Sequence, residues 1–187
     1  MNLDTHPLQQ IIRLIKNKND ASLQFGEYSY KPQEILDERR CFDVAANLLN
    51  EEWLVRQLQT LPENKEIAIH SLVKMGKKSM HIPMIDFCCQ VDELESARNV
   101  LSRLLPTYLF SSLQFYSSGR SMHAYGSTLL RPVEWRELMG RLLLTNFPGQ
   151  YPLVDARWIG HRIIGGYSAL RFSCNSKQYL QYPRLIE

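Results

Sequence analysis

The sequence HIPMIDFCC occupies residues 81–89 and predicts a strand that carries a single acidic side chain. Side chains alternate across a strand, so Asp86 and Cys88 are expected on one face, with Ile85 and Phe87 on the other. A lone carboxylate in an apolar strand costs free energy unless it has a partner or a metal ion. The role of Asp86 is therefore the first question that the sequence raises.

A second stretch, SSGRSMHAY at residues 117–125, predicts a tight turn followed by a strand. Ser121 and His123 are expected to share one face of that strand, with Met122 pointing the other way. Gly119 in the turn allows the backbone to approach a ligand closely.

The composition leads us to expect a globular protein of the cytoplasm. The 187 residues suit one domain, the apolar fraction is 44%, and no apolar run approaches the roughly 18 residues that span a membrane. The first residues lack the basic start and apolar core of a signal peptide. The four cysteines show no paired zinc spacing, so free thiols in a reducing compartment are expected.

The charge is unevenly distributed along the chain. Residues 1–119 contain 13 Lys and Arg against 15 Asp and Glu, whereas residues 120–187 contain 9 against 4. Binding of a polyanion is one cause of such asymmetry, and a chance distribution over the surface is the other.

The apolar period changes near residue 66. Before it, helical spacing over residues 5–17, and again from Pro32 to Leu61, predicts a helical N-terminal cap over residues 1–62, part of the same domain as a core over residues 63–187. Strands are expected at residues 67–73, 80–89, 109–116, 122–129 and 167–173. Helices are expected from Asp92, as an N-cap with Glu95, and from Pro132. The predicted class is α+β, a mainly antiparallel sheet with flanking helices.

Several polar residues in the core have the chemistry of a phosphate and metal site. Carboxylates hold Mg²⁺ or Mn²⁺ through oxygen, Ser and His bond phosphate oxygens, and Arg and Lys neutralise a triphosphate. The candidates are Asp86, Ser121, His123, Asp155, Arg171 and Lys177.

Three motifs in this order resemble the archaeo-eukaryotic primase superfamily. The stretch IPMIDFC (82–88) resembles its first motif, an apolar strand with two acids, and SGRSMH (118–123) resembles its Ser-x-His motif. Val154-Asp155 resembles the third motif, an apolar residue followed by Asp. His161-Arg162, LRFS (170–173) and NSK (175–177) resemble the basic continuation, so that the similarity covers residues 66–184.

The resemblance implies a primase and RRM-like core that acts as a nucleotidyltransferase on a DNA or RNA template, with a role in DNA replication. Asp86 and Asp155 would hold Mg²⁺ or Mn²⁺ and, with His123, form the catalytic set. Ser121 and His123 would orient a nucleoside triphosphate. Arg120, Arg171 and Lys177 would neutralise its charge, and a helicase or another replication or defence protein is a possible partner.

Cys88 occupies the place of the second acid of the first motif. A thiol is a poor ligand for Mg²⁺, whereas two-metal phosphoryl transfer relies on carboxylates. Three explanations remain open: one metal ion suffices, Asp92 or Glu93 substitutes, or the site binds nucleotide or nucleic acid without catalysis.

Each candidate also has a purely structural interpretation. Asp86 suits a buried ion pair, His123 a core histidine and Asp155 a helix N-cap. Arg171 suits a strand surface and Lys177 a solvated loop. An interaction protein with an accidental motif match is therefore the third hypothesis, beside an enzyme and a binding module.

Overall fold

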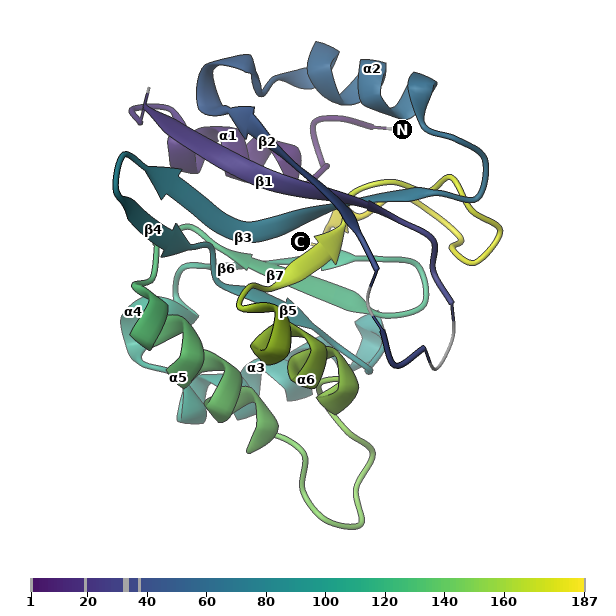
Figure 1. The fold of residues 1–187 in the computed structure, drawn as a ribbon. Helices are drawn as coiled ribbons and strands as arrows, with labels where there is room; N and C mark the ends of the chain where they lie inside the picture. The colour runs from purple at the N-terminus through teal and green to yellow at the C-terminus, as the bar shows by residue number, and fades with distance from the viewer. Residues whose placement is uncertain (1, 19, 32–33, 37, 187) are drawn as a thin grey trace.

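The computed structural model describes residues 2–18, 20–31, 34–36 and 38–186 of the chain. Its strands form two antiparallel sheets, and helices cover both sides of them (Figure 1). Helices α1 (Leu8–Ile15) and α2 (Glu51–Thr60) lie on one side of the strands, whereas α3 (Leu94–Leu104), α5 (Pro132–Leu143) and α6 (Ala156–Gly165) lie on the opposite side. The α+β class with flanking helices is confirmed.

The first sheet has the order β2-β1-β3-β4, and β8 also pairs with β3. Every pairing in this sheet is antiparallel. Its strands are β1 (Ala21–Tyr28), β2 (Arg40–Ala45), β3 (Glu66–Met75), β4 (Lys78–His81) and β8 (Ala169–Arg171).

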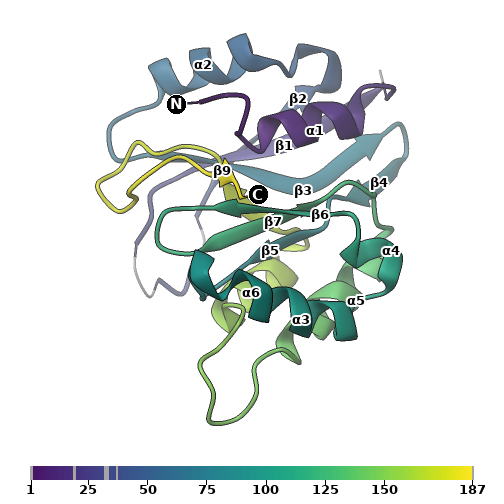
Figure 2. The ribbon, with the colours of Figure 1, turned by 180° about the vertical axis from the view of Figure 1, so that it is seen from behind.

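The second sheet has the order β5-β7-β6-β9 and carries the residues of the first two motifs. Its strands are β5 (Met84–Asp86), β6 (Leu113–Ser117), β7 (Met122–Gly126) and β9 (Arg184–Leu185). Seen from behind, β9 lies beside β6, so the end of the described chain completes this sheet (Figure 2).

Two of the helices begin where the sequence supplies a cap or a proline. Asn50 accepts a hydrogen bond from the Trp53 amide at the start of α2, and Pro132 opens α5. The helices are α1 (Leu8–Ile15), α2 (Glu51–Thr60), α3 (Leu94–Leu104), α4 (Thr107–Phe110), α5 (Pro132–Leu143) and α6 (Ala156–Gly165), with short 3₁₀ turns at Ala46–Leu48 and Val91–Glu93.

The prediction of a helical N-terminal cap is wrong for half of that segment. Among its described residues, α1, α2 and the 3₁₀ turn at Ala46–Leu48 are helical, whereas β1 and β2 extend the first sheet, and β1 pairs with β3 from Ala21 to Tyr28. In β2, Phe42 and Val44 alternate with polar residues, and this two-residue period outweighs the helical spacing of the flanking leucines. Pro32, the predicted helix start, lies outside the described residues.

The strand predicted for residues 80–89 is divided into β4 and β5. Pro83 lacks the backbone N–H that a continuous ladder needs, so the chain leaves the first sheet and enters the second at this point. Cys88 consequently lies beyond the end of β5 rather than beside Asp86 on a strand face.

Other predicted boundaries also move. Residues 107–110 are helical, so that β6 begins at Leu113, and β7 ends at Gly126 instead of Leu129. The capping box before α3 consists of Gln90 and Glu93, not Asp92 and Glu95, because a 3₁₀ turn precedes the helix.

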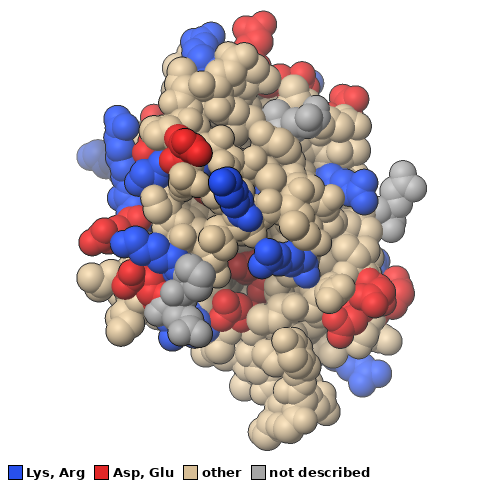
Figure 3. Space-filling model, turned by 90° about the vertical axis from the view of Figure 1, so that its right-hand side faces the viewer, with Lys and Arg blue, Asp and Glu red and all other residues tan. Residues whose placement is uncertain are grey.

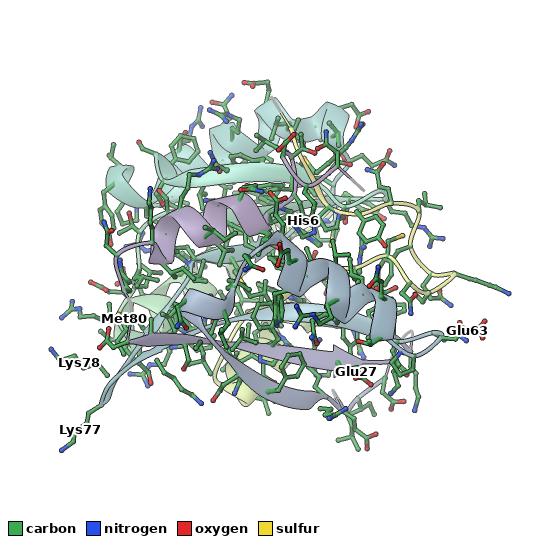
Figure 4. All side chains as sticks on the ribbon, turned by 90° about the horizontal axis from the view of Figure 1, so that it is seen from above. His6, Glu27, Glu63, Lys77, Lys78 and Met80 are labelled. Carbon is green, nitrogen blue, oxygen red and sulfur yellow. The ribbon has the colours of Figure 1, made fainter. Side chains whose placement is uncertain are left out.

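The larger of two hydrophobic clusters among the described residues joins the sheets and helices. It includes Leu23 and Ile69 from the first sheet, Ile85 and Phe115 from the second, and Trp135 from α5. Two basic residues, Lys77 and Lys78, project outward from the β3–β4 turn, in agreement with a solvated turn (Figure 4). In the part of the chain that is described, no helix combines the length and the apolar character needed to cross a bilayer.

Candidate nucleotide and metal site

Most of the predicted site residues meet in a cavity of about 580 Å³ between the two sheets and α6. Asp86, Ser121, His123, Asp155 and Arg171 all line it. Figure 3 faces this side of the molecule and shows acidic atoms recessed between basic side chains. Four segments that are distant in the sequence therefore contribute to one cavity.

The strand register places the first two motifs beside each other. Asp86 at the end of β5 lies opposite His123 in β7. His123 Nε2 lies 3.5 Å from Asp86 Oδ1, and the histidine side chain is 7% exposed, whereas that of Asp86 is 28% exposed. His123 Nδ1 is buried and has no hydrogen-bond partner among the described residues.

Asp155 reaches the same place through a short bridge between distant segments. Phe87 pairs with Val154, and the Asp155 amide donates to the Asp86 carbonyl at 3.4 Å. Asn146 holds the segment before Asp155 in place. Its Nδ2 donates to the Val154 carbonyl, and its Oδ1 accepts from the amides of Leu153 and Val154. Sequence reasoning missed Asn146, and its position in a Pro- and Gly-rich loop gave no sign of this role.

The N-cap interpretation of Asp155 is confirmed. Its Oδ1 accepts hydrogen bonds from the amides of Arg157 at 2.8 Å and Trp158 at 3.2 Å, at the start of α6. Because these bonds use only Oδ1, the cap leaves the second carboxylate oxygen of Asp155 available to a ligand.

Burial dominates the electrostatics of the Asp86–His123 pair. Burial raises the pKa of Asp86 to about 7, with a further contribution from the nearby Asp155, while Arg171 acts in the opposite direction. Burial and then Arg171 lower the pKa of His123 to about 3. The imidazole is therefore neutral at physiological pH, and the pair is not the ion pair of the structural interpretation.

The turn between β6 and β7 needs glycine at residue 119. Gly119 has φ +107°, and a Cβ there would lie 3.3 Å from side-chain atoms of both Leu180 and Gln181. The turn is closed by the Ser118 amide, which donates to the Ser121 carbonyl at 2.9 Å, and by a 3.0 Å contact between the two hydroxyls. The C-terminal segment thus packs directly on the Ser-x-His motif.

Arg171 joins this turn to the C-terminal segment. Its guanidinium donates to the main-chain carbonyls of Ser118 at 2.7 Å, of Gln181 at 3.1 Å, and of Ser173. The residue is 5% exposed, so the surface interpretation of Arg171 is wrong. The Arg171 guanidinium therefore donates to protein carbonyls, and its charge lowers the pKa values of Asp86 and His123.

The remaining predicted cations differ in position. Arg120 is exposed and lines the cavity, whereas Lys177 is exposed and absent from the lining. Three further basic residues of the lining, Arg157, His161 and Arg162, come from α6. Helical spacing after Asp155 is the signal that places Arg157 and His161 on one face of this helix.

The carboxylates fit one hard cation. Mg²⁺ commonly binds through one or two carboxylates and completes its shell with water and phosphate oxygens. Neither Cys88 nor the alternative acids Asp92 and Glu93 line the cavity, and Glu93 instead accepts from the Gln90 amide at 2.9 Å. Burial and the nearby carboxylates raise the pKa of the Cys88 thiol to about 12, so it stays neutral.

Across the described residues, no group of three or more His, Cys, Asp or Glu side chains is arranged to hold a metal ion. Asp86 and Asp155 together would supply ligands for a single ion whose shell is completed by water or substrate. The other two carboxylates of the lining, Glu34 and Glu38, are exposed and precede β2.

Comparison with known proteins identifies the family of this chain. Residues 45–184 match the family described as archaeo-eukaryotic primase 1D-like, and the chain belongs to the archaeo-eukaryotic primase superfamily. The crystal structure of primase RepB' is similar over 97% of this chain with a TM-score of 0.52 and 15% sequence identity. This likeness is one of fold, and it covers 56% of the RepB' chain. No curated protein matches this sequence.

Proposed function

We propose that this domain is a nucleotidyltransferase that adds nucleotides from nucleoside triphosphates to a strand paired with a nucleic-acid template. The observation that supports the proposal most strongly is the convergence of Asp86, His123 and Asp155 in one cavity with a basic rim. Membership of a primase superfamily supports an interaction with nucleotides and nucleic acids.

In this proposal Asp86 and Asp155 would hold one Mg²⁺ or Mn²⁺ ion. The ion, when bound, neutralises charge on the transferring phosphoryl group. The 3′ oxygen of the growing strand forms a bond to the α-phosphorus, the bond to the β-phosphate oxygen breaks, pyrophosphate leaves, and the hydroxyl proton passes to solvent.

The remaining residues of the cavity bind and orient the triphosphate. Ser121 and the neutral His123 bond phosphate oxygens without adding charge, and Arg120 and Arg157 at the rim supply positive charge. Arg171 holds the Ser-x-His turn in place through its hydrogen bond to the Ser118 carbonyl. Lys177, which lies outside the cavity, stays a predicted contact for the triphosphate. The proposal also includes a DNA or RNA template, a helicase or defence-system partner, and a cytoplasmic location.

A binding module without catalysis is the second candidate. Cys88 favours it, because this thiol stands in place of the second acid of the first motif and lies outside the lining, whereas two-metal phosphoryl transfer needs carboxylate ligands for a second ion. Such a module would bind a triphosphate in the same cavity and release it unchanged.

The test is nucleotide incorporation on a primed template with Mg²⁺ or Mn²⁺. We expect the wild-type domain to extend the primer and Asp86→Ala to lower the rate by at least about a thousandfold, because the cation loses a ligand and phosphoryl transfer depends mainly on electrostatic stabilisation. Asp92→Ala, which alters an exposed acid outside the cavity, is the matched control.

Incorporation that Asp86→Ala leaves unchanged would contradict the proposal. Calorimetry separates the two candidates, since triphosphate binding by the wild-type domain without any incorporation would support the binding module instead.

A further inference from the structure

Two tyrosines from distant segments meet at the rim of the cavity. Tyr30 follows β1 and Tyr179 lies in the C-terminal segment, and both line the cavity that contains Asp86 and Asp155. Their ring centroids lie 5.7 Å apart at an interplanar angle of 57°. The aromatic pair is therefore beside the acidic site rather than on a separate surface.

Tyr179 is fixed by contacts on two sides. Its hydroxyl lies 3.4 Å from that of Tyr28, which is buried at the end of β1. The Arg171 guanidinium lies 3.9 Å from the centre of its ring. A ring that is held in this way costs little further ordering when a ligand binds against it.

Tyr30, in contrast, presents an exposed ring. It is 46% exposed, and its neighbours at the rim, Leu36 and Leu180, are 66% and 68% exposed. None of the three belongs to the hydrophobic core of the described residues. Packing in the hydrophobic core, the usual role of an aromatic side chain, therefore does not explain the Tyr30 ring.

The residues around the tyrosine pair suit a nucleotide ligand better than a peptide ligand. Arg120 and Arg157 line the same cavity, so an exposed aromatic ring lies beside positive charge. Proteins that bind single strands combine basic grooves with aromatic rings on which bases stack. A nucleotide offers the matching pair of groups, a base with a π-face and a charged phosphate.

We propose that Tyr30 and Tyr179 form a stacking subsite for a nucleobase whose phosphates lie towards Asp86 and Asp155. The inference rests on the proposed function and adds the part of the substrate that the rim recognises. The base belongs either to a free nucleoside triphosphate or to a nucleotide of a single strand. Stacking is tolerant of base identity, so this subsite accepts all four bases.

The test compares ligands with and without a base. Calorimetry with Mn²⁺ measures the dissociation constants of inorganic triphosphate, a nonhydrolysable nucleoside triphosphate and a single-stranded oligonucleotide. We expect Tyr30→Ala to weaken binding of the nucleoside triphosphate, the oligonucleotide or both by about 5- to 50-fold, whereas inorganic triphosphate binds unchanged. Tyr30→Phe keeps the ring and is expected to bind within twofold of wild type.

Tyr151→Ala is the matched control, because Tyr151 is 84% exposed and lies outside the lining. The ligand that Tyr30→Ala weakens identifies the source of the base. If Tyr30→Ala changes neither base-containing ligand by more than twofold while triphosphate binds, the stacking subsite is wrong and the proposed function stands. If the wild-type protein binds none of the three ligands, both proposals fall.

Discussion

Replacing Asp86 with asparagine is expected to make the folded protein more stable at neutral pH, although it removes a residue of the proposed site. Burial raises the pKa of the Asp86 carboxyl from 3.8 to about 7. The folded state therefore resists the ionisation of Asp86, and at neutral pH the carboxylate lowers the free energy of unfolding. Asparagine has nearly the same shape and no charge.

The pH dependence of this effect has a definite sign. Between pH 4 and 7 the folded state binds more protons at Asp86 than the unfolded state, so the contribution of Asp86 to stability falls as the pH rises through this window. The groups that face Asp86 are His123 on β7, Asp155 before α6 and Arg171 on β8. His123 stays neutral across this range, since burial lowers its pKa to about 3.

A pKa difference of this size corresponds to about 4 kcal/mol for a fully enclosed group. The Asp86 side chain is 28% exposed, so solvent reduces the penalty and we expect Asp86→Asn to gain about 1–2 kcal/mol at pH 7.5. The measurement is urea unfolding in EDTA at several pH values, with exposed Asp92→Asn as the control. A gain that shrinks towards pH 4 is expected, and a loss of stability at pH 7.5 would contradict the assignment of Asp86 as a buried, unpaired carboxylate.

Replacing Arg171 with methionine is expected to cost about 3–5 kcal/mol of stability. Methionine fills the space but leaves the carbonyls of Ser118, Ser173 and Gln181 without their donor. Because these bonds join the Ser-x-His turn to the C-terminal segment, the turn also loses its fixed position. We expect incorporation and triphosphate binding to fall together.

Thermal unfolding and calorimetry check this prediction in three variants. Arg120→Met alters an exposed arginine in the same turn and is expected to change stability by less than about 0.5 kcal/mol. Arg171→Lys keeps the charge but lacks the planar fork, so it is expected to recover only part of the stability. Equal stability of Arg171→Met and Arg120→Met would show that the three carbonyl contacts contribute nothing.

The sequence predicted the centre of the site better than its surroundings. Alternation assigned Asp86 and His123 each to one face of its strand, whereas their meeting across β5 and β7 was predicted only from the family resemblance. The convergence of Asp155 was predicted only from the family resemblance. It depends on Asn146, whose bonds to residues 153 and 154 have no local sequence signal.

The strand β2 and the role of Arg171 were missed for a related reason. Phe42 and Val44 suit both a helical stripe and a two-residue period, and only pairing between β2 and β1 decides between them. Likewise, Arg171 acquires its three acceptors from the folded positions of the turn and of the C-terminal segment. Long-range contacts of this kind cannot be predicted from the spacing of residues along the sequence.

The central claim is that Asp86 and Asp155 share one cation, and Mn²⁺ binding measured by electron paramagnetic resonance tests it directly. Asp155→Asn retains a side-chain oxygen for the cap of α6, and Asp86→Asn retains the fold, so both variants remove charge without removing structure. We predict that the wild-type domain binds a single Mn²⁺ ion and that each substitution weakens this binding by at least about tenfold. Mn²⁺ affinity that either substitution leaves unchanged would contradict a shared ion.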